Sequence, residues 1–261
     1  MRTPGFSALA LVAAGVAAPL GAAAAQAEFH WRGAIAAGKS IEIKGVNGLV
    51  NAVAGSGETE VSAVKHARRS DPDEVKIQVV EHADGVTICA VYPSDGRREN
   101  SCEPGSDGHM NTHDNDVQVD FTVRVPAGVR FIGKTVNGNV TAANLASDVE
   151  ARTVNGGIRI STSGLANAET VNGSIVAALG RASWSDAIEF RTVNGGITVD
   201  LPATVSAEVR ASTVNGDIET DFPLTVTGHL GPRHLRGTIG TGGRELALST
   251  VNGTIRLRKT G

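Results

Sequence analysis

The sequence predicts an all-β protein, a β-solenoid of 16–22-residue coils that each turn at an Asn-Gly pair. Three observations predict this fold: a tetrapeptide that recurs along the chain, a two-residue alternation on both sides of it, and a composition of small side chains. Only 3% of the 261 residues are aromatic, whereas 41% are hydrophobic and 32 are glycine. Such a chain is too apolar to be disordered and too poor in aromatic residues for a bulky globular core.

The tetrapeptide Thr-Val-Asn-Gly occurs six times, and an earlier copy has only Val-Asn-Gly. From Asn137 onward the gaps between asparagines are 18, 17, 22, 21 and 37 residues. The last gap holds about two periods, and within it Leu235-Arg236-Gly237 aligns with Val251-Asn252-Gly253, which predicts a degenerate copy. The expected corners are Asn47-Gly48, Asn137-Gly138, Asn155-Gly156, Asn172-Gly173, Asn194-Gly195, Asn215-Gly216 and Asn252-Gly253.

Apolar and polar residues alternate around each Asn-Gly pair, with Val or Ile three residues after the Asn, as in Val140 and Ile158. This alternation indicates short strands on both sides of a sharp turn. We expect Gly there because a sharp corner needs a positive φ, which Gly adopts freely and Asn tolerates. The turn fits a meander of antiparallel hairpins or a solenoid of stacked coils. The solenoid explains the recurrence of Asn better, since stacked amides can form a ladder.

The recurring T-V-N-G-x-[IV], the early Ile41–Gly48 segment and the closing Leu246–Gly253 segment resemble a family of exported bacterial proteins. This is the candidate-adhesin β-strand-repeat family, a domain of unknown function called Toastrack. The resemblance covers about residues 28–259 and implies a right-handed parallel β-helix at the cell envelope. No catalytic motif comes with it.

Residues 1–27 have the pattern of a secretory signal peptide. Arg2 precedes a short Ala-rich apolar stretch, and Ala25-Gln26-Ala27 is a small-x-small cleavage pattern. We expect a mature chain of residues 28–261 that forms a single β-solenoid domain and is periplasmic, secreted or at the cell surface. No later stretch is long and apolar enough to predict a transmembrane segment.

A segment from about residue 55 to 120 departs from the repeat and contains both cysteines, Cys89 and Cys102. Two cysteines in an exported chain most often form a disulfide, which would stabilise this loop by about 3 kcal/mol. The loop also holds oxygen and imidazole groups that match no calcium or zinc spacing, so we expect a solvated loop and no metal. These groups are Asp107, His109, His113, Asp114 and Asp116.

Charge argues against a nucleic-acid partner, because the formal net charge is −3. The residue three positions before each corner Asn would stack into a column that is basic except for Glu169. We expect a ladder of surface ion pairs there, with a ligand face for anionic glycans or envelope polymers as the alternative. The basic residues of this face are Lys134, Arg152, Arg191 and Arg233.

The expected function is an exported, non-enzymatic envelope or surface module, adhesin-like, that needs no cofactor and binds a polymer or a protein partner. The alternative is a polysaccharide-active β-helix enzyme, since enzymes that cleave glycans use clustered carboxylates. Its carboxylates would be Asp200, Asp217, Glu219 and Asp221, with Asp200 one coil from Asp221 and level with it. A third hypothesis for the function is a purely structural envelope protein with no ligand.

Overall fold

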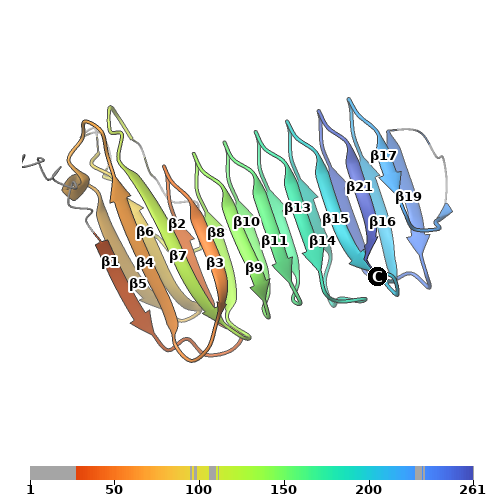
Figure 1. Ribbon diagram of the computed structural model, residues 1–261, viewed down its shortest axis with the longest axis horizontal. Helices are drawn as coiled ribbons and strands as arrows, with labels where there is room; N and C mark the ends of the chain where they lie inside the picture. The colour runs from red at the N-terminus through yellow and green to blue at the C-terminus, as the bar shows by residue number, and fades with distance from the viewer. Residues whose placement is uncertain are drawn as a thin grey trace, which may run out of the picture.

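The computed structural model describes residues 28–260 apart from 95, 97–98, 106–109, 111, 227–230 and 232. The signal peptide predicted for residues 1–27 therefore lies outside the described residues. Within them the chain forms 21 β-strands and one short 3-10 helix, η1 (Pro72–Glu74). Two sheets face each other along an elongated stack (Figure 1), which confirms the all-β class.

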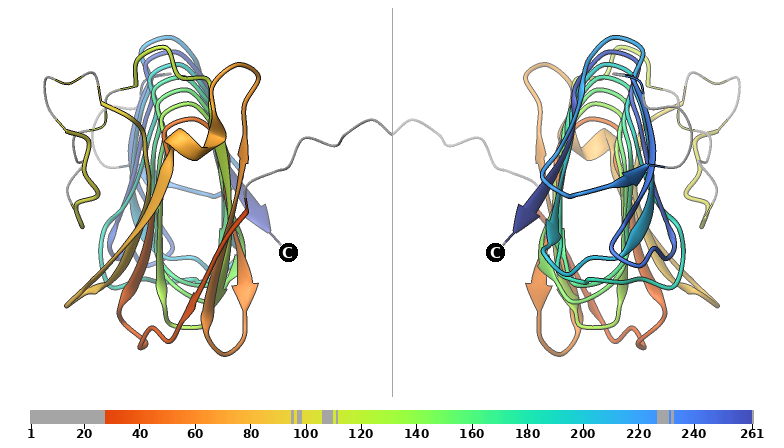
Figure 2. Two further views of the ribbon diagram at one scale, coloured as in Figure 1. Left: turned by 90° about the vertical axis from the view of Figure 1, so that its left-hand side faces the viewer. Right: turned by 90° about the vertical axis from the view of Figure 1, so that its right-hand side faces the viewer.

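The sheets have ten and eleven strands, and an end view shows them as the two walls of a flattened tube (Figure 2). In space, sheet A runs β1 (Glu28–Gly33), β4 (Thr59–His66), β7 (Gln118–Pro126), β3 (Val50–Gly55), β9 (Val140–Leu145), β11 (Ile158–Thr162), β13 (Ile175–Leu179), β15 (Ile197–Pro202), β21 (Ile255–Thr260) and β17 (Ile218–Thr220). Sheet B runs β18 (Thr225–Val226), β19 (His234–Ile239), β16 (Ala207–Ser212), β20 (Glu245–Ser249), β14 (Ile188–Arg191), β12 (Ala166–Glu169), β10 (Val149–Arg152), β8 (Arg130–Lys134), β2 (Ser40–Lys44), β6 (Gly85–Val91) and β5 (Lys76–His82).

Seven coils carry the repeat, and each contains a strand of sheet B, a Val-Asn-Gly turn and a strand of sheet A. In one of them, β8 ends at Lys134 in sheet B and β9 begins at Val140 in sheet A, with Asn137 between them. Neighbouring coils pair in parallel, and their corner asparagines lie in register. This pairing confirms stacked coils and contradicts the meander of antiparallel hairpins.

The core between the sheets consists of every second residue of each strand. In β11, Ile158 and Ile160 are buried, whereas Arg159 between them is exposed. Most buried side chains are Val, Ile, Leu or Ala, because the narrow space between two closely facing walls has little room for aromatic rings. This explains how a chain with few aromatic residues builds a continuous core.

The threonine of each turn points inward and bonds to the adjacent coil. The six turn threonines are at most 5% exposed. Each hydroxyl donates to a glycine carbonyl of the neighbouring coil, as Thr153 does to Gly138 and Thr170 to Gly156, both at 2.9 Å. A buried hydroxyl needs such an acceptor to offset its desolvation.

The asparagines form the predicted ladder. Except for Asn47 at its first position, each corner asparagine donates from Nδ2 to the Oδ1 of the asparagine in the coil that precedes it in space, through six hydrogen bonds of 2.7–2.8 Å. In spatial order the ladder is Asn47, Asn137, Asn155, Asn172, Asn194, Asn252 and Asn215. The repeated amide therefore joins seven coils through side chains as well as through backbone.

Glycine is required in the turn for a reason other than the one expected from the sequence. Among the seven corner glycines only Gly48 and Gly216 have a positive φ, and none of the corner asparagines does. A Cβ at Gly156 would instead lie 1.9 Å from the Gly138 carbonyl oxygen of the neighbouring coil. A Cβ at Gly173 would lie equally close, 1.9 Å, to the Gly156 carbonyl oxygen. Stacked backbones approach too closely there for any side chain.

The spatial order of the coils differs from their order in the sequence at the C-terminal end. The last coil, β20–β21, lies between the β14–β15 and β16–β17 coils, since β21 pairs with both β15 and β17. Arg236 lies inside β19, which runs antiparallel to β16. The predicted degenerate turn at Leu235-Arg236-Gly237 is therefore wrong, and the long gap is the path of the chain to the edge of sheet B and back.

The N-terminal end shows a similar departure. The first coil, β2–β3, lies between β6–β7 and β8–β9, because β2 pairs with β6 and β8 while β3 pairs with β7 and β9. The segment that departs from the repeat in the sequence, about residues 55–120, supplies β4, β5 and β6. These strands extend both sheets beyond the repeat, with β1, β4 and β5 pairing antiparallel.

The close approach at the turns can be tested with two adjacent glycines. We expect Gly156→Ala to lower the free energy of unfolding by about 2–4 kcal/mol, because its Cβ would overlap a backbone carbonyl that cannot move alone. Gly157→Ala is the matched control, since its nearest neighbour, the Ser174 carbonyl oxygen, is 3.4 Å away. Urea unfolding measures both. Equal losses for the two variants would contradict the stacking explanation.

Candidate functional site

A cleft lies on the outer face of sheet B, beside the segment tied down by the disulfide. Its volume is about 360 Å³. Successive coils contribute the same two positions to it, one charged and one valine, while the disulfide segment contributes the opposite wall. The lining includes Lys44, Lys134, Arg152 and Glu169, then Val46, Val136, Val154 and Val171, and across from them Cys89, Ser101 and Met110.

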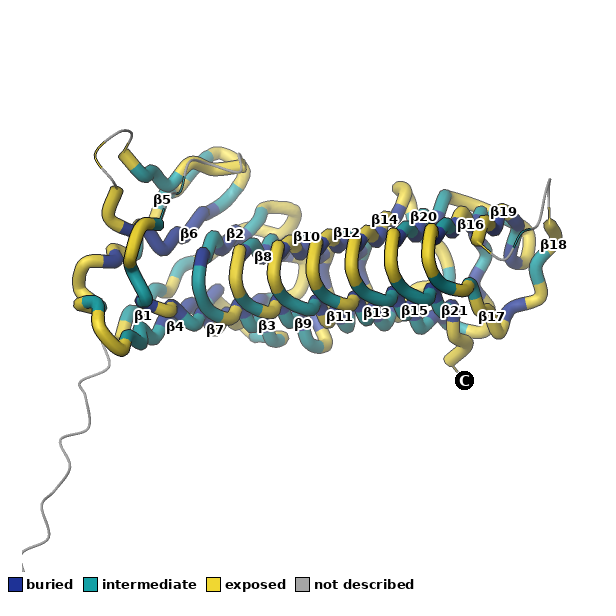
Figure 3. Tube along the Cα trace, turned by 90° about the horizontal axis from the view of Figure 1, so that it is seen from above, coloured by how far each residue is buried: buried dark blue, intermediate teal, exposed yellow. Residues whose placement is uncertain are grey.

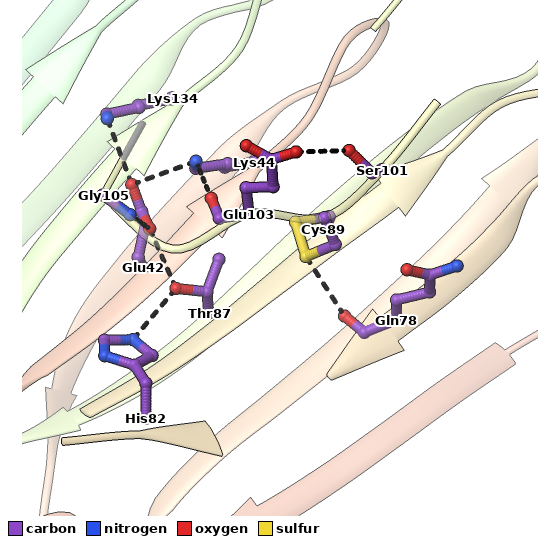
Figure 4. The surroundings of a disulfide bond; sticks show 11 residues. Glu42, Lys44, Gln78, His82, Thr87, Cys89, Ser101, Glu103, Gly105 and Lys134 are labelled. Atoms are coloured by element: carbon purple, nitrogen blue, oxygen red, sulfur yellow. Dashed lines mark hydrogen bonds and ion pairs between the residues drawn. A yellow bond between two sulfur atoms is a disulfide. The ribbon is translucent and has the colours of Figure 1, made fainter. Parts of the chain in front are cut away.

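The disulfide predicted from the sequence is present and holds this wall in place. Cys89 lies in β6, and Cys102 lies in the following segment with its Cα 5.7 Å away. Two polar contacts hold the same segment against β2: Gly105 N donates to Glu42 Oε2 at 3.1 Å, and Lys44 Nζ donates to the Glu103 carbonyl (Figure 4). The disulfide segment therefore covers the outer face of sheet B at the first coil.

A buried ion cluster lies at the foot of the cleft. Glu42 occupies an outward-facing position of β2, yet it is only 2% exposed, since the disulfide segment covers it. Its Oε1 lies 3.1 Å from Lys134 Nζ and 3.7 Å from Lys44 Nζ, and Thr87 donates to its Oε2 at 2.9 Å. Figure 4 shows these groups converging on one carboxylate. Sequence analysis did not predict this cluster, because Glu42 lies in the first coil, outside the predicted basic column.

Hydrogen bonds to Glu42 outweigh the effect of its burial. Burial raises the pKa of this carboxyl, but the bond from Gly105 N, the contact with Lys134 and the bond from Thr87 together hold the pKa below its ordinary value of 4.5. Glu42 is thus ionised at neutral pH and compensates the lysines beside it.

The predicted basic face is a row of ion pairs. Lys134 and Arg152 line the cleft, and Arg191 lies in an adjoining groove of about 320 Å³. Arg152 Nε is 3.2 Å from Glu150, and an Arg191 nitrogen is 2.7 Å from Glu189.

Glu169 pairs in register with Arg152 on one side and Arg191 on the other, so one acidic side chain lies between two basic ones. Arg233 lies at the far end of the stack, where its carbonyl accepts from Thr213 N; Ser249 and Ser212 lie between it and Arg191.

A row of exposed valines beside this face was not foreseen from the sequence. The six turn valines beyond Val46, three of which line the cleft, are 37–55% exposed, and they form a stripe about 24 Å long at the usual strand spacing. Val46, at the covered end, is only 6% exposed. Figure 3 shows the row of exposed turns from above. In spatial order the exposed valines are Val136, Val154, Val171, Val193, Val251 and Val214.

The four carboxylates of the enzymatic alternative do not form one cluster. Strand β21 lies between β15 and β17, so Asp200 pairs with Arg258 and is two strands away from the others. Glu219 Oε2 is 2.8 Å from Arg256 Nε. The expectation that Asp200 lies one coil from Asp221 is therefore wrong, whereas the two residues are level as expected, because Asp200 pairs with Arg258 and Thr220, next to Asp221, pairs with Leu257. Asp217 and Asp221 flank the same edge strand, where Asp221 Oδ2 accepts from Lys259 N.

The oxygen and imidazole groups near the disulfide are occupied by local contacts where they are described. Asp116 accepts from the backbone N–H groups of Ser70 and Arg69, and these bonds lower its pKa to about 2. His113 lies 3.3 Å from Asp114. Asp107 and His109 lie outside the described residues. Within the described residues no three such side chains are close enough together to hold a metal ion.

Comparison with known proteins identifies one family. The model of the family named Toastrack DUF4097 matches residues 37–258. No curated protein matches the chain.

Several solved structures are similar to the chain at low identity. A candidate cell adhesion protein from Clostridium sporogenes ATCC 15579 is 10% identical, with a TM-score of 0.48, over 90% of this chain and 100% of that one. A candidate adhesin from Bacteroides fragilis NCTC 9343 is 12% identical, with a TM-score of 0.36, over 88% and 97%. At TM-scores and sequence identities this low, the function of these proteins is not assigned to this chain.

The buried ion cluster predicts a pH-dependent contribution to stability. We expect Glu42→Gln to lower the free energy of unfolding at neutral pH by about 3 kcal/mol or more, because the neighbouring lysines lose a buried counter-charge. The pKa of Glu42 is lower in the folded than in the unfolded chain. Its stabilisation is therefore complete above pH 4.5 and disappears as the pH falls through the folded-state value.

Urea unfolding of both proteins at neutral and acidic pH tests this, and the difference between them should shrink in acid. Glu189→Gln is the control, since that carboxylate is 52% exposed and should change stability by less than about 1 kcal/mol. A Glu42→Gln deficit that stays constant with pH would contradict the assignment.

Proposed function

Starting from a chain that belongs to the Toastrack DUF4097 family, we propose an exported, non-enzymatic module of the cell envelope or surface that binds a polymer or a protein partner in an adhesin-like manner. The observation that carries the proposal is the cleft beside the disulfide, which continues into the row of exposed valines. Binding takes place there, with Lys134 and Arg152 in the cleft and Arg191 next to it.

The shape of this surface suits an extended ligand. Each coil repeats the same valine and the same neighbouring position at a spacing of about 4.8 Å. An elongated partner can contact several coils in the same way, so that weak contacts add up along its length. Contiguous apolar surface rimmed by polar groups is typical of interaction sites. Carboxylates pair with the basic groups beside the stripe, which favours a ligand with both polar and apolar groups over a simple polyanion.

The coils form a right-handed β-helix with Asn-Gly corners in this proposal, and the rigid stack presents the stripe without rearrangement. The location outside the cytoplasm is supported by the disulfide and by the signal-peptide pattern of residues 1–27. Across the described residues, no helix has the length and apolarity needed to cross a bilayer.

The enzymatic alternative loses its main support. It required Asp200 beside the three other carboxylates, and β21 separates them. A glycosidase needs two carboxyl groups on either side of one bond. No observation favours this alternative over the binding module.

Cosedimentation tests the proposal. The purified protein is mixed with insoluble cell-wall polymers and with envelope fractions that retain their proteins, and the supernatant is assayed for released sugar. We expect binding without release. Release of sugar would contradict the non-enzymatic assignment, and the absence of binding to every fraction would contradict the adhesin-like role.

Two substitutions locate the binding surface. We expect Arg152→Glu and Val154→Glu each to weaken binding about tenfold, because both place a new charge at the cleft. Arg159→Glu is the matched control: Arg159 belongs to the same coil but lies exposed on sheet A. Equal binding by all three variants would contradict this assignment and indicate that the ligand binds another face of the protein.

A further inference from the structure

The corner ladder ends at Asn215, and its last Asn-Gly pair differs from the other six. Asn215 Nδ2 donates to Asn252 Oδ1 at 2.8 Å, but no asparagine of the ladder donates to Asn215 Oδ1 in turn. No coil follows it at the edge of sheet A, where β17 is the last strand. Among the described residues, nothing donates to Asn215 Oδ1. Val214, beside it, is 55% exposed and thus the most exposed of the turn valines.

The glycine nitrogen shows the same difference. In the other six pairs the glycine N–H donates to the asparagine carbonyl of the next coil at 2.9–3.1 Å, as Gly156 does to Asn172 and Gly253 does to Asn215. Gly216 has no next coil, and its N–H finds no acceptor among the described residues. The nitrogen of Gly216 and the side-chain amide of Asn215 are therefore both less restrained than at any other corner.

We propose that Asn215-Gly216 is a site of spontaneous deamidation in the folded protein, with water as the only co-reactant. The backbone nitrogen of Gly216, after loss of its proton, attacks Cγ of Asn215. A bond forms between this nitrogen and Cγ, the bond from Cγ to Nδ2 breaks, and ammonia leaves. Water then opens the five-membered imide at either carbonyl and leaves aspartate or isoaspartate. The net change is the gain of one water and the loss of one ammonia.

Glycine makes the attack accessible, because no Cβ shields its nitrogen. Asparagine is among the thermolabile residues, and all seven corners have the Asn-Gly sequence. The corners differ in how many hydrogen bonds restrain the glycine nitrogen and the asparagine side chain. At the six other corners the reaction must first break the glycine N–H bond and a bond to the asparagine Oδ1, which requires local opening of two packed coils. Among the described residues, the Asn215-Gly216 corner has neither of these two bonds.

The product changes the end of the stack. A carboxylate at this position no longer has the Nδ2 hydrogens that bond to Asn252. It also places a negative charge next to an acidic edge, where Asp217, Glu219 and Asp221 already lie. Each event thus makes this end more acidic and weakens its attachment to the inner coils, while the ladder inside the stack stays intact.

Peptide mapping by mass spectrometry tests the proposal. The purified protein is incubated folded in mildly alkaline buffer, and in parallel unfolded in guanidinium chloride, and asparagine, aspartate and isoaspartate are quantified at each corner. In the folded protein we expect Asn215 to react about tenfold or more faster than any other corner. In the unfolded protein the seven rates should agree within a few-fold, since the local sequence is the same.

Asn215→Gln provides the control, because glutamine keeps a side-chain amide but reacts far more slowly through the larger ring it would form. Ammonia release from this folded variant should fall by the amount that peptide mapping assigns to Asn215. A second variant, Asn252→Ala, removes the donor to Asn194 Oδ1 but leaves the backbone bond of Gly195, and the rate at Asn194 should rise by less than the native rate at Asn215. An Asn215 rate in the folded protein no higher than that of the interior corners would overturn the proposal.

Discussion

The rest of the structure depends on the contact between successive turns. At six of the seven corners the glycine of one coil lies so close to the glycine carbonyl of a neighbouring coil that a methyl group would have no room, and at Gly48 the close carbonyl is that of Val119. This contact sets the coil spacing, and the spacing brings the threonine hydroxyl to its acceptor and the asparagine amides into a ladder. Glycine, threonine and asparagine therefore recur together, because all three depend on the same spacing between neighbouring coils.

The same spacing determines what the outer surface can offer. Turn valines face outward because the threonine before them faces inward, so a repeat that stabilises the core also exposes an apolar stripe. The stripe becomes a cleft only where the disulfide segment lies across it. There the outward position of β2 holds a buried carboxylate, Glu42, in place of a solvated side chain. The candidate site thus arises where a non-repeating segment meets a repeating surface.

Sequence reasoning predicted the coils, the ladder and the disulfide, because each follows from local spacing and residue chemistry. Predictions from the sequence failed where the neighbours of a strand in space are not its neighbours in the sequence. Arg236 matched the repeat by pattern, but β19 runs antiparallel beside β16. The carboxylates near Asp217 were placed one coil from Asp200 because sequence neighbours were assumed to be spatial neighbours, and β21 separates them. Glu42 was missed since its burial depends on a segment more than sixty residues further along the chain.

The inserted last coil has a consequence for how the protein reaches its native state. Most repeat proteins can extend one unit at a time as the chain appears. Here the β16–β17 coil reaches its native position only after β20 and β21 are available, because among the described residues they are the coil strands that β16 and β17 pair with in parallel. The edge of the growing stack at β14–β15 stays open until β20 and β21 have been synthesised and have paired with it. A chain truncated before β20 would therefore be left with an open strand edge that invites degradation or aggregation.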